Sequence, residues 1–145
     1  LQDNANMKVS WEDFNKRKKE DTIEHIYPQS PNDTYWKNRF GHLKPSEKRM
    51  YLNSLGNLLL LSRSKNSKLQ NYDFDKKKCQ RNKDGKEIGY YNGSYSEIEV
   101  SKQKEWTPDE IKKRGMSMLQ FMEHRWNFKF KDWNIDKEEI LLPFK

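Results

Sequence analysis

The sequence is short of the residues that build disulfide-linked, zinc-binding and membrane-spanning proteins. It holds one cysteine, Cys79, so no disulfide can form within the chain. With three histidines and one cysteine, we do not expect a structural zinc site. The longest apolar run, Leu58–Leu61, is far shorter than the ~20 residues of a membrane span. No secretory hydrophobic region and no Walker-type glycine-rich loop occurs.

Apolar residues are also scarce, whereas aromatic residues are not. Hydrophobic residues make up only 32% of the chain and charged residues 35%, a balance that on its own favours disorder. Five Trp, seven Tyr and seven Phe act against this, because each aromatic side chain buries a large area. The length of 145 residues fits one domain. We therefore expect an ordered domain with a small core and a highly charged surface.

The charge is unbalanced towards basic residues. Lys and Arg number 29 against 22 Asp and Glu, which gives a formal net charge of +7. A field of this sign suits a polyanion such as nucleic acid, or an anionic membrane surface.

Helix and strand signals divide the chain into short elements. The clearest is at Thr107, where an N-cap threonine, Pro108 and Glu110 predict the start of a helix. Helices are predicted over 11–19, 33–40, 46–53, 66–81 (with a possible break near 71–73) and 107–127. Strands are predicted over 22–26 and 58–62, the second as a buried strand, and the tail 140–144 as an edge strand. Residues 86–103 give little pattern beyond a turn at 92–93.

Polar residues fall at fixed places in this order of strand, strand and helix. If the two strands pair antiparallel and the helix packs across them, His25 and Asn66 can face one shallow site. Imidazole suits a general base near neutral pH, and Mg²⁺ accepts one carboxylate and one amide oxygen among its ligands. Glu24 and Asn66 could supply these oxygens. Adjacent strand residues point to opposite faces, so Glu24 and His25 can share a site only if the strand ends at His25.

These residues resemble the HNH (His-Me finger, ββα-metal) endonucleases, and among them the C-terminal nuclease domain of GmrSD-type modification-dependent (type IV) restriction enzymes. The matching motifs are Ile23-Glu24-His25-Ile26-x-Pro28-Gln29, Leu55-Gly56-Asn57-Leu58-x-Leu60-Leu61, Asn66, Phe74-x-x-Lys77 and Trp106-x-x-x-x-Ile111-x-x-Arg114. The resemblance covers roughly residues 20–126.

The resemblance implies a fold and a site. The fold is a single α+β domain over 1–145, mostly helical, with a ββα-metal core at about 20–82 and a helical part at about 104–127. His25 would be the general base, and the amide of Asn57 would orient the loop that bears it. Glu24 and Asn66 would bind a divalent metal, Mg²⁺ or alternatively Mn²⁺. Many HNH enzymes have Asp where this chain has Glu24, so direct ligation by Glu24 is the weaker assignment.

The resemblance also implies a function: metal-dependent hydrolysis of DNA phosphodiesters in a restriction or anti-phage system that acts on modified or foreign DNA. Such a chain would work in the prokaryotic cytoplasm as part of a larger protein, with an NTPase or modification-sensing domain or subunit outside it. The basic residues expected to contact DNA are Arg63, Lys68, Lys76, Lys77 and Arg114. Two alternatives remain open, a nucleic-acid-binding module without catalysis and an RNA-directed toxin nuclease.

Overall fold

The computed structural model describes residues 21–131 and 139–141. This part of the chain is mixed α+β, mostly helical, with two small two-stranded sheets, as the predicted class requires. The elements are β1 (Asp21–His25), α2 (Thr34–Phe40), α3 (Pro45–Asn53), η1 (Leu55–Asn57), β2 (Leu58–Ser62), α4 (Arg63–Leu69), α5 (Phe74–Lys78), β3 (Gln80–Arg81), β4 (Glu87–Ile88), η2 (Tyr90–Asn92), α6 (Tyr95–Ser101) and α7 (Pro108–Trp126). The predicted helix over 11–19 lies outside the described residues.

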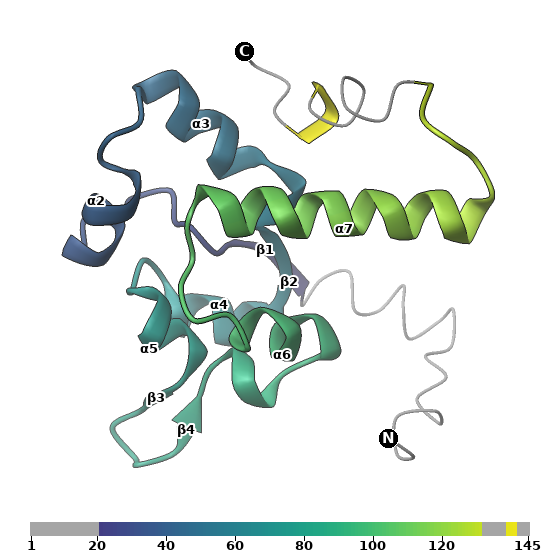
Figure 1. The fold of residues 1–145 in the computed structure, drawn as a ribbon. Helices are drawn as coiled ribbons and strands as arrows, with labels where there is room; N and C mark the ends of the chain where they lie inside the picture. The colour runs from purple at the N-terminus through teal and green to yellow at the C-terminus, as the bar shows by residue number, and fades with distance from the viewer. Residues whose placement is uncertain (1–20, 132–138, 142–145) are drawn as a thin grey trace, which may run out of the picture.

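Strands β1 and β2 lie at the centre of the molecule, with α4 packed against both of them (Figure 1). They pair antiparallel, as predicted, in a register that sets His25 opposite Leu58. The prediction that β2 is a buried strand is wrong for one of its faces. Leu59 and Leu61 are buried, but Leu60 is 67% exposed, because no described element covers that side of the two strands. The strand pair therefore has one core face and one open face.

The connection from β1 to β2 contributes much of the aromatic core. Asp33 caps α2, because its side chain accepts a hydrogen bond from the amide of Tyr35, and Gly41 ends the helix as predicted. Trp36 and Phe40 on α2 are buried, and Phe40 stacks on the ring of Tyr27 with ring centroids 3.8 Å apart. The loop that follows β1 is thus fixed against α2.

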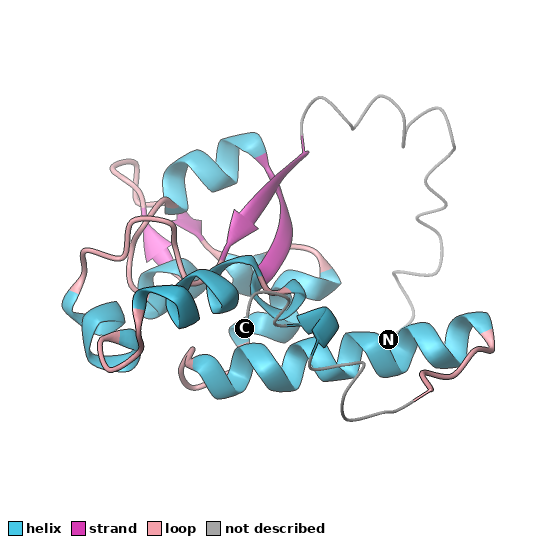
Figure 2. Cartoon of the chain, turned by 90° about the horizontal axis from the view of Figure 1, so that it is seen from above, coloured by secondary structure: helices cyan, strands magenta, loops and turns pink. Residues whose placement is uncertain are grey.

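Helix α7 crosses the 3₁₀ turn η1 that leads into β2, and Figure 2 shows its length beside the rest of the domain. It starts as predicted, with Thr107 as N-cap and Glu110 completing the capping box. The crossing is close at Gly56, where a Cβ atom would lie 1.9 Å from the carbonyl oxygen of Ile111. Only glycine fits there, so the Gly56-Asn57 pair fixes the approach of η1 to α7.

The predicted helix over 66–81 is in fact two helices, with the break close to where the sequence suggested one. Ser62 caps α4 and Asp73 caps α5, and Gln70 between them adopts a positive φ of 39°. Because α4 begins at Arg63, Asn66 lies inside the helix rather than at its start.

Two further segments differ from the prediction. Residues 86–103 form β4, η2 and α6, and α6 carries a capping box of Ser94 and Glu97 that the sequence could have revealed. Ile140 and Leu141 are helical rather than an edge strand, and Leu141 is buried near Gly115 on α7. Residues 142–144 of that predicted strand lie outside the described part. Among the described helices, none is long and apolar enough to cross a membrane.

Candidate active site

A polar cavity of about 220 Å³ lies where β1 ends and faces α4. The loop that leaves β1 and the residues that follow α4 complete its wall. Its lining residues are Ile23, Glu24, His25, Pro28, Gln29, Asn66, Gln70 and Asn71. The structure therefore brings Glu24, His25 and Asn66 to one cavity, although α4 follows β1 only after the whole α2–α3 connection.

Asn57 holds the loop that leaves β1 after His25. Its side chain is fully buried, and Oδ1 accepts hydrogen bonds from the amide of Tyr27 (2.8 Å) and from Nε1 of Trp106 (3.1 Å). Its Nδ2 donates to the carbonyl oxygens of Tyr27 (3.0 Å) and Leu52 (3.0 Å). Its own carbonyl oxygen accepts from the amide of Ile26 at 3.0 Å. All these groups are satisfied, so Asn57 holds the chain at Ile26 and Tyr27, directly after His25.

Asn57 is itself held in place by α7 and by the segment before it. Nη1 of Arg114 donates to the carbonyl oxygens of Gly56 (2.7 Å) and Leu58 (2.8 Å), on either side of Asn57. The amide of Trp106 donates to the hydroxyl oxygen of Tyr35 at 2.8 Å. The ring nitrogen and the backbone of Trp106 thus connect Asn57 to α2.

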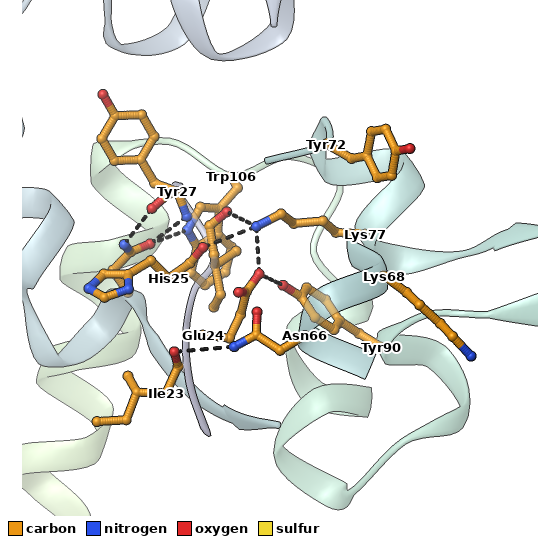
Figure 3. Close-up of polar contacts among 12 residues, drawn as sticks. Ile23, Glu24, His25, Tyr27, Asn66, Lys68, Tyr72, Lys77, Tyr90 and Trp106 are labelled. Atoms are coloured by element: carbon orange, nitrogen blue, oxygen red, sulfur yellow. Dashed lines mark hydrogen bonds and ion pairs between the residues drawn. The ribbon is translucent and has the colours of Figure 1, made fainter. Parts of the chain in front are cut away.

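Glu24 points into the protein interior and is 4% exposed. Its Oε1 atom accepts from Nζ of Lys77 at 2.5 Å and from the hydroxyl of Tyr90 at 2.9 Å (Figure 3). Burial raises the pKa of Tyr90 well above its ordinary value, and the adjacent Glu24 carboxylate adds to this rise. Tyr90 therefore stays a hydrogen-bond donor to Glu24.

The expectation that Lys77 contacts DNA has to be corrected. Its side chain has no exposed surface, and besides Glu24 it donates to the carbonyl oxygens of His25 (3.0 Å) and Ile26 (3.1 Å). Burial lowers the pKa of Lys77, and the attraction of Glu24 opposes that effect. All three contacts go to the interior, so no part of the ammonium group is available to a phosphate.

His25 is the last residue of β1 and is partly exposed at the cavity. Burial lowers the pKa of its imidazole below the ordinary value; the Glu24 carboxylate acts in the opposite direction, and the Lys77 ammonium adds to the lowering. A histidine with a lowered pKa is neutral at pH 7 and can accept a proton there. Because β1 ends at this residue, His25 and Glu24 both reach the cavity despite being neighbours in a strand.

Asn66 is oriented by hydrogen bonds to β1. Its Nδ2 donates to Oγ1 of Thr22 at 2.8 Å and to the carbonyl oxygen of Ile23 at 3.3 Å. The Thr22 hydroxyl donates its own proton to the carbonyl of Leu61 (3.2 Å), so it must accept from Asn66. This fixes which end of the amide faces β1. In Figure 3 the amide oxygen of Asn66 lies on the side of the Glu24 carboxylate.

The polar atoms that remain at the cavity suit a hard divalent cation. Among the lining residues, Glu24 and Asn66 carry a carboxylate and an amide oxygen, which are the ligand types that Mg²⁺ and Mn²⁺ prefer. Among the described residues there is no group of three or more His, Cys, Asp or Glu side chains that could hold a metal ion.

The other basic residues expected to contact DNA lie at the surface to different extents. Arg63 and Lys68 on α4 are exposed. Lys76 is 53% exposed and forms an ion pair with Asp73 at 2.9 Å. Arg114 is partly buried and uses Nη1 for the backbone of η1 and β2. Of these residues, Arg63 and Lys68 on α4 therefore offer the least committed positive charge.

Reasoning from the sequence missed Tyr90 and the inward direction of Lys77. Tyr90 lies in the stretch over 86–103 that gave little pattern, and no local signal marked it. Lys77 lies within the run Lys76–Lys78, in which nothing distinguishes the buried lysine from its exposed and half-buried neighbours except its place three residues after the buried Phe74.

A protein-family model matches most of the chain. The model described as GmrSD restriction endonucleases, C-terminal domain, matches residues 2–121. No curated protein and no solved structure matches the chain.

Proposed function

The chain belongs to the family of GmrSD restriction endonuclease C-terminal domains, and on this basis we propose that it is the DNA-cleaving module of a type IV restriction system. The observation that carries the proposal is the meeting of His25, Glu24 and Asn66 at one cavity, next to a loop held by Asn57. A carboxylate, an imidazole and an amide oxygen together are the groups that metal-dependent phosphodiester hydrolysis needs.

In this proposal β1, β2 and α4 act as the ββα-metal finger of an HNH endonuclease. The first strand brings His25 and Glu24, the turn before the second strand brings Asn57, and the helix brings Asn66. The antiparallel register and the packing of α4 on both strands support this assignment.

His25 is the proposed general base. Its neutral imidazole takes a proton from a water molecule as the water oxygen attacks phosphorus in line with the 3′ oxygen. The bond between phosphorus and the 3′ oxygen breaks, and the departing oxygen takes a proton from solvent, which leaves a 5′-phosphate and a 3′-hydroxyl. The lowered pKa of His25 supports this role, since it keeps the base unprotonated at neutral pH.

Glu24 and Asn66 would hold the metal ion, Mg²⁺ or Mn²⁺. When bound there, a divalent cation supplies stabilisation of the negative charge on the phosphorane and on the departing oxygen. The oxygen-rich donor set supports this choice over zinc. Asn57 acts at a distance from the phosphate, by fixing the backbone that carries His25.

Arg63 and Lys68 are the main proposed phosphate contacts, and Lys76 is a further one. They offer charge but no groove-reading element, so they position DNA without reading its sequence. Family membership implies other GmrSD domains besides this one, and the chain has no Walker-type loop. We therefore assign nucleotide hydrolysis and the recognition of modified bases to those other domains.

One experiment tests the proposal. Purified protein is incubated with supercoiled plasmid and, separately, with RNA, each with Mg²⁺, Mn²⁺ or EDTA. Metal-dependent nicking of the plasmid that disappears in His25→Ala supports it. Cleavage of RNA alone would instead assign an RNA nuclease, and binding without cleavage under every metal condition would assign a binding module.

A further inference from the structure

We propose that Lys77 and Tyr90 are positioning residues, which fix one oxygen of Glu24 and the backbone of His25 so that the second oxygen of Glu24 is presented to a metal ion. This inference rests on the proposed function. It concerns two residues that touch neither substrate nor metal and that act through Glu24 and His25.

The first step is the arrangement of donors around Glu24. Both Lys77 and Tyr90 donate to the same oxygen, Oε1, at 2.5 and 2.9 Å. Two donors from different elements, α5 and η2, prevent the carboxylate from turning about its last bond. Glu24 also lines the cavity, and Oε2 takes neither of these hydrogen bonds, so we assign Oε2 to the cavity side.

The second step is the backbone beside it. The Lys77 ammonium also donates to the carbonyl oxygens of His25 and Ile26, while Asn57 holds the next residue, Tyr27, from the other side. The Lys77 ammonium therefore holds the proposed metal ligand, Glu24, and the backbone of the proposed base, His25, in a fixed position relative to each other.

The third step concerns why a charge is placed there. Burying an ion pair is an inefficient way to stabilise a fold, because loss of hydration offsets much of the attraction. An apolar side chain could fill the same space at less cost. The three groups to which Lys77 donates belong to Glu24 and His25 of the candidate site and to Ile26, which follows them. This choice of partners points to a role in positioning the site and not in stability alone.

The two roles that Lys77 could have predict opposite effects on metal binding. If the ammonium acted only as a nearby positive charge, Lys77→Met would strengthen binding of a cation. If it positions Glu24, its loss weakens binding. Tyr90→Phe changes no charge and removes one hydroxyl, so weaker binding in that variant reports position alone. Lys77→Arg keeps the charge and changes the geometry.

The test compares wild type with Tyr90→Phe, Lys77→Arg and Lys77→Met in two assays: Mn²⁺ affinity measured by electron paramagnetic resonance without DNA, and the Mg²⁺ concentration for half-maximal nicking. We expect about 10–100-fold weaker metal binding in Tyr90→Phe and Lys77→Arg, with unchanged DNA affinity and a folded protein by circular dichroism. If Lys77→Met fails to fold, the other two variants still decide the matter.

The chain offers matched controls. Tyr91→Phe removes a hydroxyl that donates to the Glu87 carboxylate at 2.7 Å, one residue away from Tyr90. Lys65→Met breaks a partly buried ion pair to Glu97 of the same 2.5 Å length. Both should keep wild-type metal affinity, even where Lys65→Met lowers the melting temperature.

Wild-type metal affinity in both Tyr90→Phe and Lys77→Arg would overturn this inference without contradicting the proposed nuclease function. An equal loss of affinity in the control variants would also overturn it, because the effect would then be general destabilisation. A wild-type protein that binds Mn²⁺ but cuts neither DNA nor RNA would contradict the proposed function and leave positioning to be judged from the Mn²⁺ affinities. A wild type that neither cuts nor binds Mn²⁺ would overturn both.

Discussion

Asn57 pairs with both backbone groups of Tyr27, accepting from its amide at 2.8 Å and donating to its carbonyl at 3.0 Å. The pair behaves like one rung of a β-ladder, built by a side chain instead of a second strand. It forms two residues after His25, where β1 has ended and no strand is available to hold the chain.

Asn57→Ala should therefore lower stability and activity together. The change leaves the buried amide and carbonyl of Tyr27 without partners, and each such group costs ~1–3 kcal/mol. We expect the free energy of unfolding in urea to fall by at least that amount. Asn53→Ala is the control, since Asn53 is the exposed last residue of α3 and its side chain donates to the carbonyl oxygen of Arg49 at the surface. Equal losses in the two variants would contradict this role for Asn57.

His25→Ala should abolish cleavage while leaving the fold and DNA affinity nearly unchanged. General-base catalysis contributes roughly 10²–10⁴-fold, so the single-turnover nicking rate should fall by about that factor. His42→Ala removes an exposed histidine that does not line the cavity, and this variant should cut at the wild-type rate. A His25→Ala protein that cuts normally would remove the base assignment.

Asn66→Ala should raise the Mg²⁺ concentration needed for half-maximal activity, because it removes a ligand oxygen. Asn66→Asp keeps an oxygen at that place and should need less Mg²⁺ than Asn66→Ala. The measurement is a Mg²⁺ titration of plasmid nicking for all three proteins. If the three curves coincide, Asn66 does not bind the metal.

DNA binding by this chain alone should be weak, non-specific and dependent on salt, in the range of ~10⁻⁴–10⁻⁶ M at physiological salt. Arg63→Ala and Lys68→Ala should each reduce the slope of log affinity against log salt by about 1. Lys129→Ala, just beyond the end of α7 that lies away from α4 in Figure 1, should not change the slope. A more than tenfold preference for hydroxymethylated over plain duplex would show that this chain reads modified bases itself.

Tyr35 gives the fold a specific sensitivity to alkali. Burial raises the pKa of its phenol from 10.0 to about 12. The neutral phenol is favoured in the fold, so its contribution to stability is complete below pH 10 and is lost as the pH rises from 10 towards 12. Urea unfolding at pH 9, 10 and 11 should show a smaller decline for Tyr35→Phe than for wild type. Tyr95→Phe, at a residue that is 73% exposed, should decline as wild type does.

The elements that were predicted correctly carry strong local signals. α7 is capped by Thr107, where a cap residue, a proline and a glutamate coincide. β2 follows from a short apolar run bounded by a glycine and by charge, and β1 from a stretch that ends before Pro28. The break between α4 and α5 was also visible in the sequence, but the N-cap at Ser62 was not, because a serine between apolar and basic residues gives no periodic signal.

The residues of the candidate site also fall into two groups, those that the sequence identifies and those that it does not. His25, Asn57 and Asn66 belong to motifs, so the sequence could name them. The partners of Glu24 could not be named, because they depend on packing between elements far apart in the chain. The spacing Phe74-x-x-Lys77 places Lys77 on the buried face of α5, but that its ammonium reaches Glu24 depends on packing between segments 53 positions apart.

The separation of these partners along the chain sets a lower limit on the size of a working nuclease. Tyr27 and Asn57 are 30 positions apart, Glu24 and Lys77 are 53 apart, and Glu24 and Tyr90 are 66 apart. The ββα segment over 20–82 contains His25, Asn57 and Asn66, yet it lacks Tyr90, Trp106 and Arg114 that hold them. Contacts of such range require long loops to close, at a cost in chain entropy. The segment over 20–82, excised from this chain, would therefore keep His25, Asn57 and Asn66 but lose the residues that hold them in place.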